Sequence, residues 1–146
     1  MRISIAVGAR MNQQSSVKLV LFVEDESASR RGYVMYLTAA GFNVQEAATG
    51  QAALSAARAR RPDVIVLDLG LPDIDGWEVA RQLRAAPATA SVPIIALTGS
   101  DLPHERVSAM RAGCDRHLAK PCVPQHLLET IQLCIGELER KGREGR

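Results

Sequence analysis

The chain has 146 residues, of which 47% are hydrophobic and 23% are charged, and its formal net charge at pH 7 is +2. That length is enough for one domain with a sizeable core, so the chain needs no disulfide or metal ion in order to fold. The arginines are spread along the chain, which does not indicate a nucleic-acid surface, and no apolar run approaches the roughly 18 residues of a membrane span.

Residues 1–16 show no sustained hydrophobic period, and we expect them to form a flexible N-terminal extension in which Met1 or Met11 is the true start. Arg10 interrupts the one short apolar stretch, which therefore makes a poor secretory signal. The cysteines are odd in number and lack CxxC spacing, as is typical of a reducing compartment. We expect a soluble, cytoplasmic protein.

Beyond residue 16, short runs rich in branched apolar residues alternate with segments of helical character. Five strands are predicted, over VKLVLFV (17–23), FNVQEA (42–47), DVIVLDL (63–69), VPIIALT (92–98) and DRHLAK (115–120). Helices are predicted over SASRRGYVMYLTAAG (27–41), GQAALSAARARR (50–61) and DGWEVARQLRAA (75–86), where Asp75 is placed to cap the helix start. The last helix should bury a stripe formed by Leu127, Ile131, Cys134 and Leu138, and residues 139–146 should form a charged tail that frays.

Strands that are apolar throughout, such as residues 63–69 and 92–98, must be covered on both faces. Parallel strands between two layers of helices meet that requirement. Right-handed crossovers then give an α/β fold with a doubly wound, five-stranded parallel sheet and helices on both faces. Ligands of such sheets sit beyond the carboxyl ends of the strands.

Polar side chains follow four of these strand ends: Glu24 and Asp25 after the first, Asp68 after the third, Thr98 after the fourth and Lys120 after the fifth. Parallel strands bring these ends to one rim, where three carboxylates and one ammonium group leave two uncompensated negative charges. A divalent ion would balance them. Because the candidate ligands are all oxygens, Mg²⁺ is favoured over Zn²⁺, and Mn²⁺ could substitute.

A rim with Mg²⁺, a lysine and a hydroxyl is also equipped to hold a phosphoryl group. Asp68 is the candidate nucleophile, because a carboxylate can be phosphorylated directly and this one ends the predicted central strand. Gly70 could offer its backbone carbonyl to the metal, since it has no side chain to obstruct the approach.

Four segments in this order, VEDE (23–26), VLDLGLPDIDG (66–76), ALTG (96–99) and AGCDRHLAKP (112–121), resemble the receiver domain of two-component response regulators. The resemblance covers residues 17–138 and implies a flavodoxin-like fold with strand order 2-1-3-4-5. It assigns the phosphoacceptor to Asp68, the metal-binding acid pair to Glu24 and Asp25, the lysine that pairs with the phosphorylated aspartate to Lys120, and the switching hydroxyl to Thr98. In this family the peptide bond before the proline that matches Pro121 is commonly cis.

The resemblance implies a phosphorelay or two-component role, in which a histidine kinase or histidine phosphotransfer protein donates a phosphoryl group to Asp68. The domain would catalyse its own phosphorylation and dephosphorylation, while acting chiefly as a switch whose surface changes around the fourth helix and fifth strand. Output would pass to a downstream effector protein. No nucleic-acid or membrane partner is expected, and the chain could be a piece of a larger protein.

One position departs from the family pattern, because His117 stands where a Tyr or Phe is common. His117 is predicted to be a switch residue together with Thr98, or else an ordinary exposed residue. Gly70 and Ser100 are the positions that influence the lifetime of the phosphoryl group, and their small size favours a short one. Arg30 and Arg31 are expected to decorate a solvated helix face, although in receivers that helix also docks the kinase.

Two alternatives come from other classes of protein. A phosphatase of the haloacid dehalogenase type would need D-x-D-x-T after its first strand, where this chain has E-D-E-S at 24–27. A receiver-like binding module that is never phosphorylated stays open, because the presence of every required group does not show that the groups are used.

Overall fold

The computed structural model describes residues 17–99 and 103–144. The expected N-terminal extension, residues 1–16, lies outside this part of the chain, and so does Ser100. The strands are β1 (Leu19–Val23), β2 (Asn43–Ala47), β3 (Val64–Asp68), β4 (Ile94–Thr98) and β5 (Arg116–Ala119). The helices are α2 (Ser27–Ala39), α3 (Gly50–Ala59), α4 (Gly76–Ala85), α5 (Pro103–Ala112) and α6 (Pro124–Glu144).

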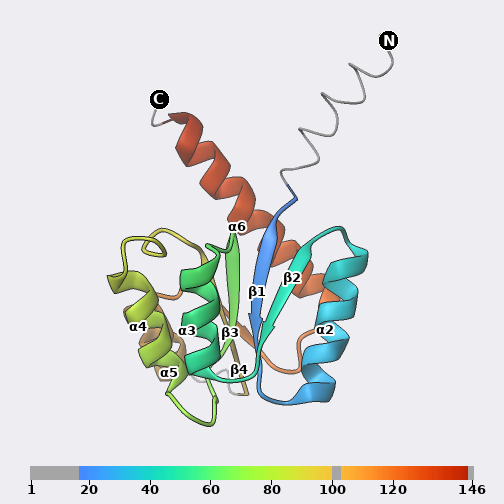
Figure 1. The fold of residues 1–146 in the computed structure, drawn as a ribbon, viewed down its shortest axis with the longest axis vertical. Coiled ribbons are helices and arrows are strands. Elements are labelled where there is room, and N and C mark those ends of the chain that lie inside the picture. The colour runs from blue at the N-terminus through green and yellow to red at the C-terminus, as the bar shows by residue number, and fades with distance from the viewer. Residues whose placement is uncertain (1–16, 100–102, 145–146) are drawn as a thin grey trace.

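The five strands form one parallel sheet in the order β2-β1-β3-β4-β5, which confirms the predicted fold class and strand order. Figure 1 shows α3, α4 and α5 on one face of the sheet and α2 and α6 on the other. The strand order reverses between β1 and β3, because the chain adds β2 on one side of β1 and the later strands on the other. The rim beyond the ends of β1 and β3 is therefore where a ligand site is expected.

The sheet separates the core into two clusters, because successive strand residues point to opposite faces. On β1, Leu21 packs into the cluster under α3, α4 and α5, and its neighbour Phe22 packs into the cluster under α2 and α6. Ile65 and Val66 divide in the same way on β3. Each fully buried side chain of this size contributes about 1.5–3 kcal/mol of transfer free energy, so the sheet centre is the rigid support of the rim.

The helices begin and end where local side chains satisfy the backbone. Asp75 caps α4 as predicted, since its carboxylate accepts a hydrogen bond of 2.9 Å from the N–H of Trp77. Helix α2 ends at Ala39, and Gly41 follows with φ of 104°, a left-handed conformation that favours glycine. Asp73, which the sequence did not single out, accepts hydrogen bonds from the N–H groups of Gly50 and Gln51 at the start of α3. It thereby ties the loop after β3 to the neighbouring helix.

Helix α6 is longer than the sequence suggested. Leu127, Ile131 and Cys134 are buried as expected, but Leu138 is 37% exposed and does not belong to the buried stripe. The helix continues to Glu144, and its last turns project beyond the sheet and the other described helices (Figure 1). Among the described helices, none combines the length and apolar character needed to cross a membrane.

Candidate functional site

The carboxylates that the sequence places after β1 and β3 meet at the rim. Val23 pairs with Leu67 in the register of β1 and β3, so the next residues, Glu24 and Asp68, lie side by side. Carboxylate oxygens of Glu24, Asp25 and Asp68 all lie within 4.8 Å of one another. Glu24 is 1% exposed and Asp68 is 7% exposed, whereas Asp25 faces solvent. The three acids therefore form one cluster with an open side.

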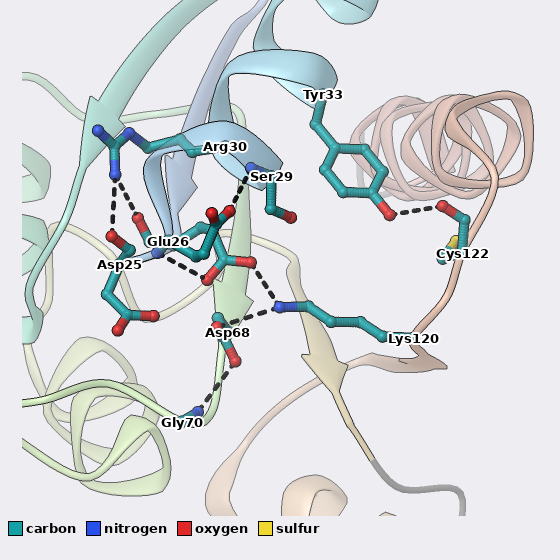
Figure 2. A network of polar contacts seen from close by, with 10 residues as sticks. Asp25, Glu26, Ser29, Arg30, Tyr33, Asp68, Gly70, Lys120 and Cys122 are labelled. Carbon is teal, nitrogen blue, oxygen red and sulfur yellow. Dashed lines mark hydrogen bonds and ion pairs between the residues drawn. The ribbon is translucent and has the colours of Figure 1, made fainter.

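Lys120 joins this cluster from the loop between β5 and α6. Its Nζ donates to Glu24 Oε1 at 2.5 Å and to Asp68 Oδ2 at 3.2 Å, and Figure 2 shows the contact with Asp68. Its backbone N–H donates to the carbonyl of Thr98 at 2.6 Å, which fixes the loop beside the end of β4. The bond between Lys120 and Pro121 is cis, as the family resemblance implies. The structure thus brings the lysine and the acids together from far-apart segments.

The ionisable side chains at the rim differ in the direction in which their pKa values are shifted. Burial raises the pKa of Glu24 from 4.5 to about 6, and the neighbouring Asp68 reinforces that rise. Burial would also raise the pKa of Asp68, but hydrogen bonds from Glu24 and from the Gly70 N–H, together with Lys120, hold it below its usual value. Burial disfavours the charged form of Lys120 as well, yet the two carboxylates keep its pKa raised. Glu24 is therefore the first of the two carboxylates to take up a proton as the pH falls.

Gly70 acts on Asp68 through its amide. Its N–H donates to Asp68 Oδ1 at 3.0 Å and so orients the carboxylate (Figure 2). A Cβ at this position would lie 3.7 Å from the same oxygen, which is ordinary contact, so the space here does not require glycine. The expected role of the Gly70 carbonyl toward a metal stays a prediction.

The donor set fits a hard divalent cation. The cluster of Glu24, Asp25 and Asp68 offers only carboxylate oxygens, and such a set of ligands favours Mg²⁺ over Zn²⁺. The exposed Asp25 leaves one side accessible to water, and Mg²⁺ keeps several waters in its shell. The residues present therefore suit Mg²⁺ or Mn²⁺.

Thr98 and His117 lie next to the cluster on β4 and β5. Thr98 Oγ1 and His117 Nε2 are 3.0 Å apart and share a hydrogen bond, in which the imidazole tautomer decides which atom donates. A shallow hollow connects Thr98 to Asp68 and is also lined by Trp77 and Glu105. Trp77 is partly buried and packs against the core. The predicted hydroxyl and phosphoacceptor thus share one hollow.

Arg30 is a site residue that the sequence did not reveal. Its guanidinium Nη1 donates to the Glu24 carbonyl at 2.7 Å, and its Nε donates to Glu46 Oε1 at 3.0 Å. The expectation that Arg30 decorates a solvated face is therefore wrong, whereas Arg31 is exposed as expected. Side chains in a helix point toward its N-terminus, so an Arg in the first turn could reach back over the preceding loop. The sequence therefore indicates the direction of the Arg30 side chain, but it does not identify the carbonyl that accepts its hydrogen bond.

Comparison with known proteins identifies relatives of this chain. Residues 20–132 match the family described as the response regulator receiver domain. The chain is 46% identical over 102 residues to the KDP operon transcriptional regulatory protein KdpE of Escherichia coli, covering 70% of this chain and 44% of the relative. The chain spans about half the length of the curated relatives it matches.

Two solved structures have the same architecture. A chemotaxis response regulator of Vibrio cholerae superposes with a TM-score of 0.78 at 32% identity, covering 82% of this chain and 99% of the other. The receiver domain of a sensor histidine kinase from Pseudomonas aeruginosa gives a TM-score of 0.77 at 34% identity, with 83% and 99% covered. In that relative a magnesium ion is coordinated in the active site cleft.

Proposed function

The chain belongs to the response regulator receiver family of two-component signal transduction, and from that premise we propose that Asp68 accepts a phosphoryl group from a phosphohistidine. The observation that carries this proposal is the cluster of Glu24, Asp25, Asp68 and Lys120 at one rim of the sheet. A receiver of this kind implies a histidine kinase as its partner, with or without an intermediate histidine phosphotransfer protein.

Asp68 is suited to act as the nucleophile. Its lowered pKa keeps the carboxylate ionised at neutral pH, and the Gly70 N–H and Lys120 hold its orientation. In the proposed step one carboxylate oxygen forms a bond to phosphorus while the bond between phosphorus and the donor's imidazole nitrogen breaks. The electron pair of that bond returns to the imidazole. Water later hydrolyses the acyl phosphate and restores the carboxylate.

The acids of the cluster fit a supporting metal ion. We infer that Glu24, Asp25, Asp68 and the Gly70 carbonyl hold Mg²⁺, as the magnesium ion in the Pseudomonas receiver supports, and that Mn²⁺ can replace it. When bound, Mg²⁺ would supply positive charge that offsets the negative charge of the carboxylates and of the incoming phosphoryl group. Lys120 contributes a second cation, which already touches Asp68 and would stay within reach of the phosphoryl oxygens.

The hydrogen bond between Thr98 and His117 suggests how the signal is transmitted. Phosphorylation adds charge and acceptor oxygens beside Thr98, which would turn its hydroxyl toward them and release His117. The surface around α5 and β5 would then change and engage a downstream effector protein. Gly70 and Ser100 would set how easily water reaches the acyl phosphate, and the small size of both residues favours a short lifetime.

The direct test is phosphorylation by acetyl phosphate, followed by intact mass. The wild-type chain should gain the mass of one phosphoryl group when Mg²⁺ is present and none when EDTA removes the metal. The Asp68→Asn chain should gain nothing under either condition, and a Thr98→Ala chain should still be phosphorylated. A wild-type chain that gains no mass would favour the alternative, a receiver-like binding module that is not phosphorylated.

A further inference from the structure

Arg30 donates hydrogen bonds to backbone carbonyls of the acidic loop, residues 24–26, and not to the carboxylates of that loop. The guanidinium Nη1 donates to the carbonyl of Glu24 at 2.7 Å and, at the longer distance of 3.5 Å, to the carbonyl of Asp25. Its Nε forms an ion pair of 3.0 Å with Glu46 on β2. Figure 2 shows the Arg30 guanidinium directed toward the backbone oxygen of Asp25. One side chain therefore connects the loop, α2 and the edge strand.

We propose that Arg30 is a positioning residue that fixes the backbone of the acidic loop and thereby prepares Glu24 and Asp25 to bind a divalent cation. This inference rests on the proposed metal-binding function. It assigns to Arg30 no contact with the ion or with the phosphoryl group.

The loop needs such a constraint because of its sequence. Glu24, Asp25 and Glu26 are consecutive acids, and like charges at close range favour conformations in which their side chains separate. The N–H of Glu24 is held by the carbonyl of Ala47 at 3.0 Å, and Glu26 is held as the cap of α2. Arg30 holds the carbonyl side of the same short segment. These contacts together fix the direction in which the first two carboxylates leave the backbone.

Arginine suits this task better than lysine. Its planar guanidinium presents several donors in fixed directions, so one group can serve backbone carbonyls on one side and a carboxylate on the other. A hydrogen bond from a charged donor is also roughly twice as strong as a neutral one. The Arg30 side chain is 19% exposed, so solvent screens these contacts only in part.

The direction in which Mg²⁺ affinity changes when Arg30 is removed distinguishes a positioning role from simple electrostatic repulsion. Arg30 is a cation close to a cation site, so through-space repulsion alone predicts that its removal tightens Mg²⁺ binding. Positioning predicts the opposite, because a looser loop must be ordered when the ion binds. Loss of a group that orients metal ligands typically weakens metal affinity by about tenfold or more.

The experiment measures Mg²⁺ affinity of the full chain by calorimetric titration, with Arg30→Met compared against Arg31→Met. The two substitutions remove the same charge from neighbouring positions, but Arg31 is exposed and lies outside the site. We expect a Kd about tenfold higher for Arg30→Met and an unchanged or slightly lower Kd for Arg31→Met. Phosphorylation of Arg30→Met by acetyl phosphate should return to the wild-type rate at saturating Mg²⁺.

Two further variants keep the test decisive. Arg30→Lys should weaken binding less than Arg30→Met, since it keeps the charge without the planar donors. If Arg30→Met unfolds, Glu46→Gln removes only the ion pair that steadies the guanidinium and should raise the Kd by a few-fold. Equal or tighter Mg²⁺ binding by Arg30→Met, or wild-type affinity of Arg30→Lys or Glu46→Gln, would overturn the inference. Failure of the wild-type chain itself to bind Mg²⁺ would instead overturn the proposed function.

Discussion

Replacing Gly76 with Ala should destabilise the protein, because this residue is where α4 packs against the loop that leaves β3. A Cβ at Gly76 would lie 2.5 Å from the Cα of Leu69 and 2.9 Å from the carbonyl oxygen of Asp68. Both are backbone atoms, which cannot move aside by changing a rotamer. The new methyl group would have to retreat by about 1 Å to reach the ordinary contact distance near 3.5 Å.

The cost follows from that displacement. Overpacking of a well-filled site costs typically 1–3 kcal/mol, and backbone contacts place Gly76→Ala near the upper figure, at about 3 kcal/mol. The shift would also strain the hydrogen bond of 3.3 Å from the Gly76 N–H to the Leu69 carbonyl. Because Asp68 is one of the contacted residues, we expect weaker Mg²⁺ binding together with the loss of stability.

Gly32→Ala is the matched control. Gly32 lies inside α2, and a Cβ there would meet no atom within 4 Å. Alanine is favoured over glycine inside a helix by about 1 kcal/mol, so this variant should be more stable than wild type. Urea denaturation should therefore show that the free energy of unfolding falls below the wild-type value for Gly76→Ala and rises above it for Gly32→Ala. The two variants should differ from each other by roughly 4 kcal/mol. A Gly76→Ala chain as stable as wild type would refute the close packing of α4 on the Asp68 loop.

Four further substitutions test other parts of the structure. Hydrogen bonds from the start of α3 lower the pKa of Asp73 below 3.8, so its carboxylate stabilises the fold above about pH 4, and that stability is lost as the pH falls through the lowered pKa. The stability difference between wild type and Asp73→Asn in urea denaturation should shrink from about pH 5 to pH 3, and a constant difference would contradict the capping role. Ile131→Ala should cost about 2–5 kcal/mol while Leu138→Ala costs under about 1 kcal/mol, and similar losses would mean that Leu138 is covered in solution. His117→Ala should leave phosphorylation of Asp68 intact but weaken the shift to the active state, so NMR spectra of the phosphorylated chain that match wild type would count against a switch role.

The strands were predictable because the pattern that specifies them is local and periodic, whereas their order came from the family resemblance. A run such as residues 63–69 is apolar on both faces, and this pattern alone requires covering layers above and below. The same reasoning located Glu24, Asp68 and Lys120 at one rim, because parallel strands end on the same side. The helix cap formed by Asp75 was also predictable, since capping involves residues that are close together in the sequence.

The missed features depend on where separate elements meet. Leu138 follows the periodicity of the α6 stripe, but no sequence pattern says where the helix runs past the sheet. In the sequence Arg30 and Asp73 resemble ordinary surface charges. The partner of Arg30 is a carbonyl of the acidic loop, and the partner of Asp73 is an N–H group at the start of α3. Such contacts are fixed by tertiary packing, which a period in one segment does not encode.

The central claim is that the carboxylate of Asp68 accepts the phosphoryl group. Borohydride reduces an acyl phosphate to an alcohol, so treating the acetyl phosphate-labelled chain with borohydride and mapping its peptides by mass identifies the residue that was phosphorylated. The account predicts homoserine at position 68 in a reaction that requires Mg²⁺. Homoserine at position 25, the longer alcohol 2-amino-5-hydroxypentanoic acid at position 24, or a borohydride-resistant phosphate on a serine, threonine or histidine would contradict it.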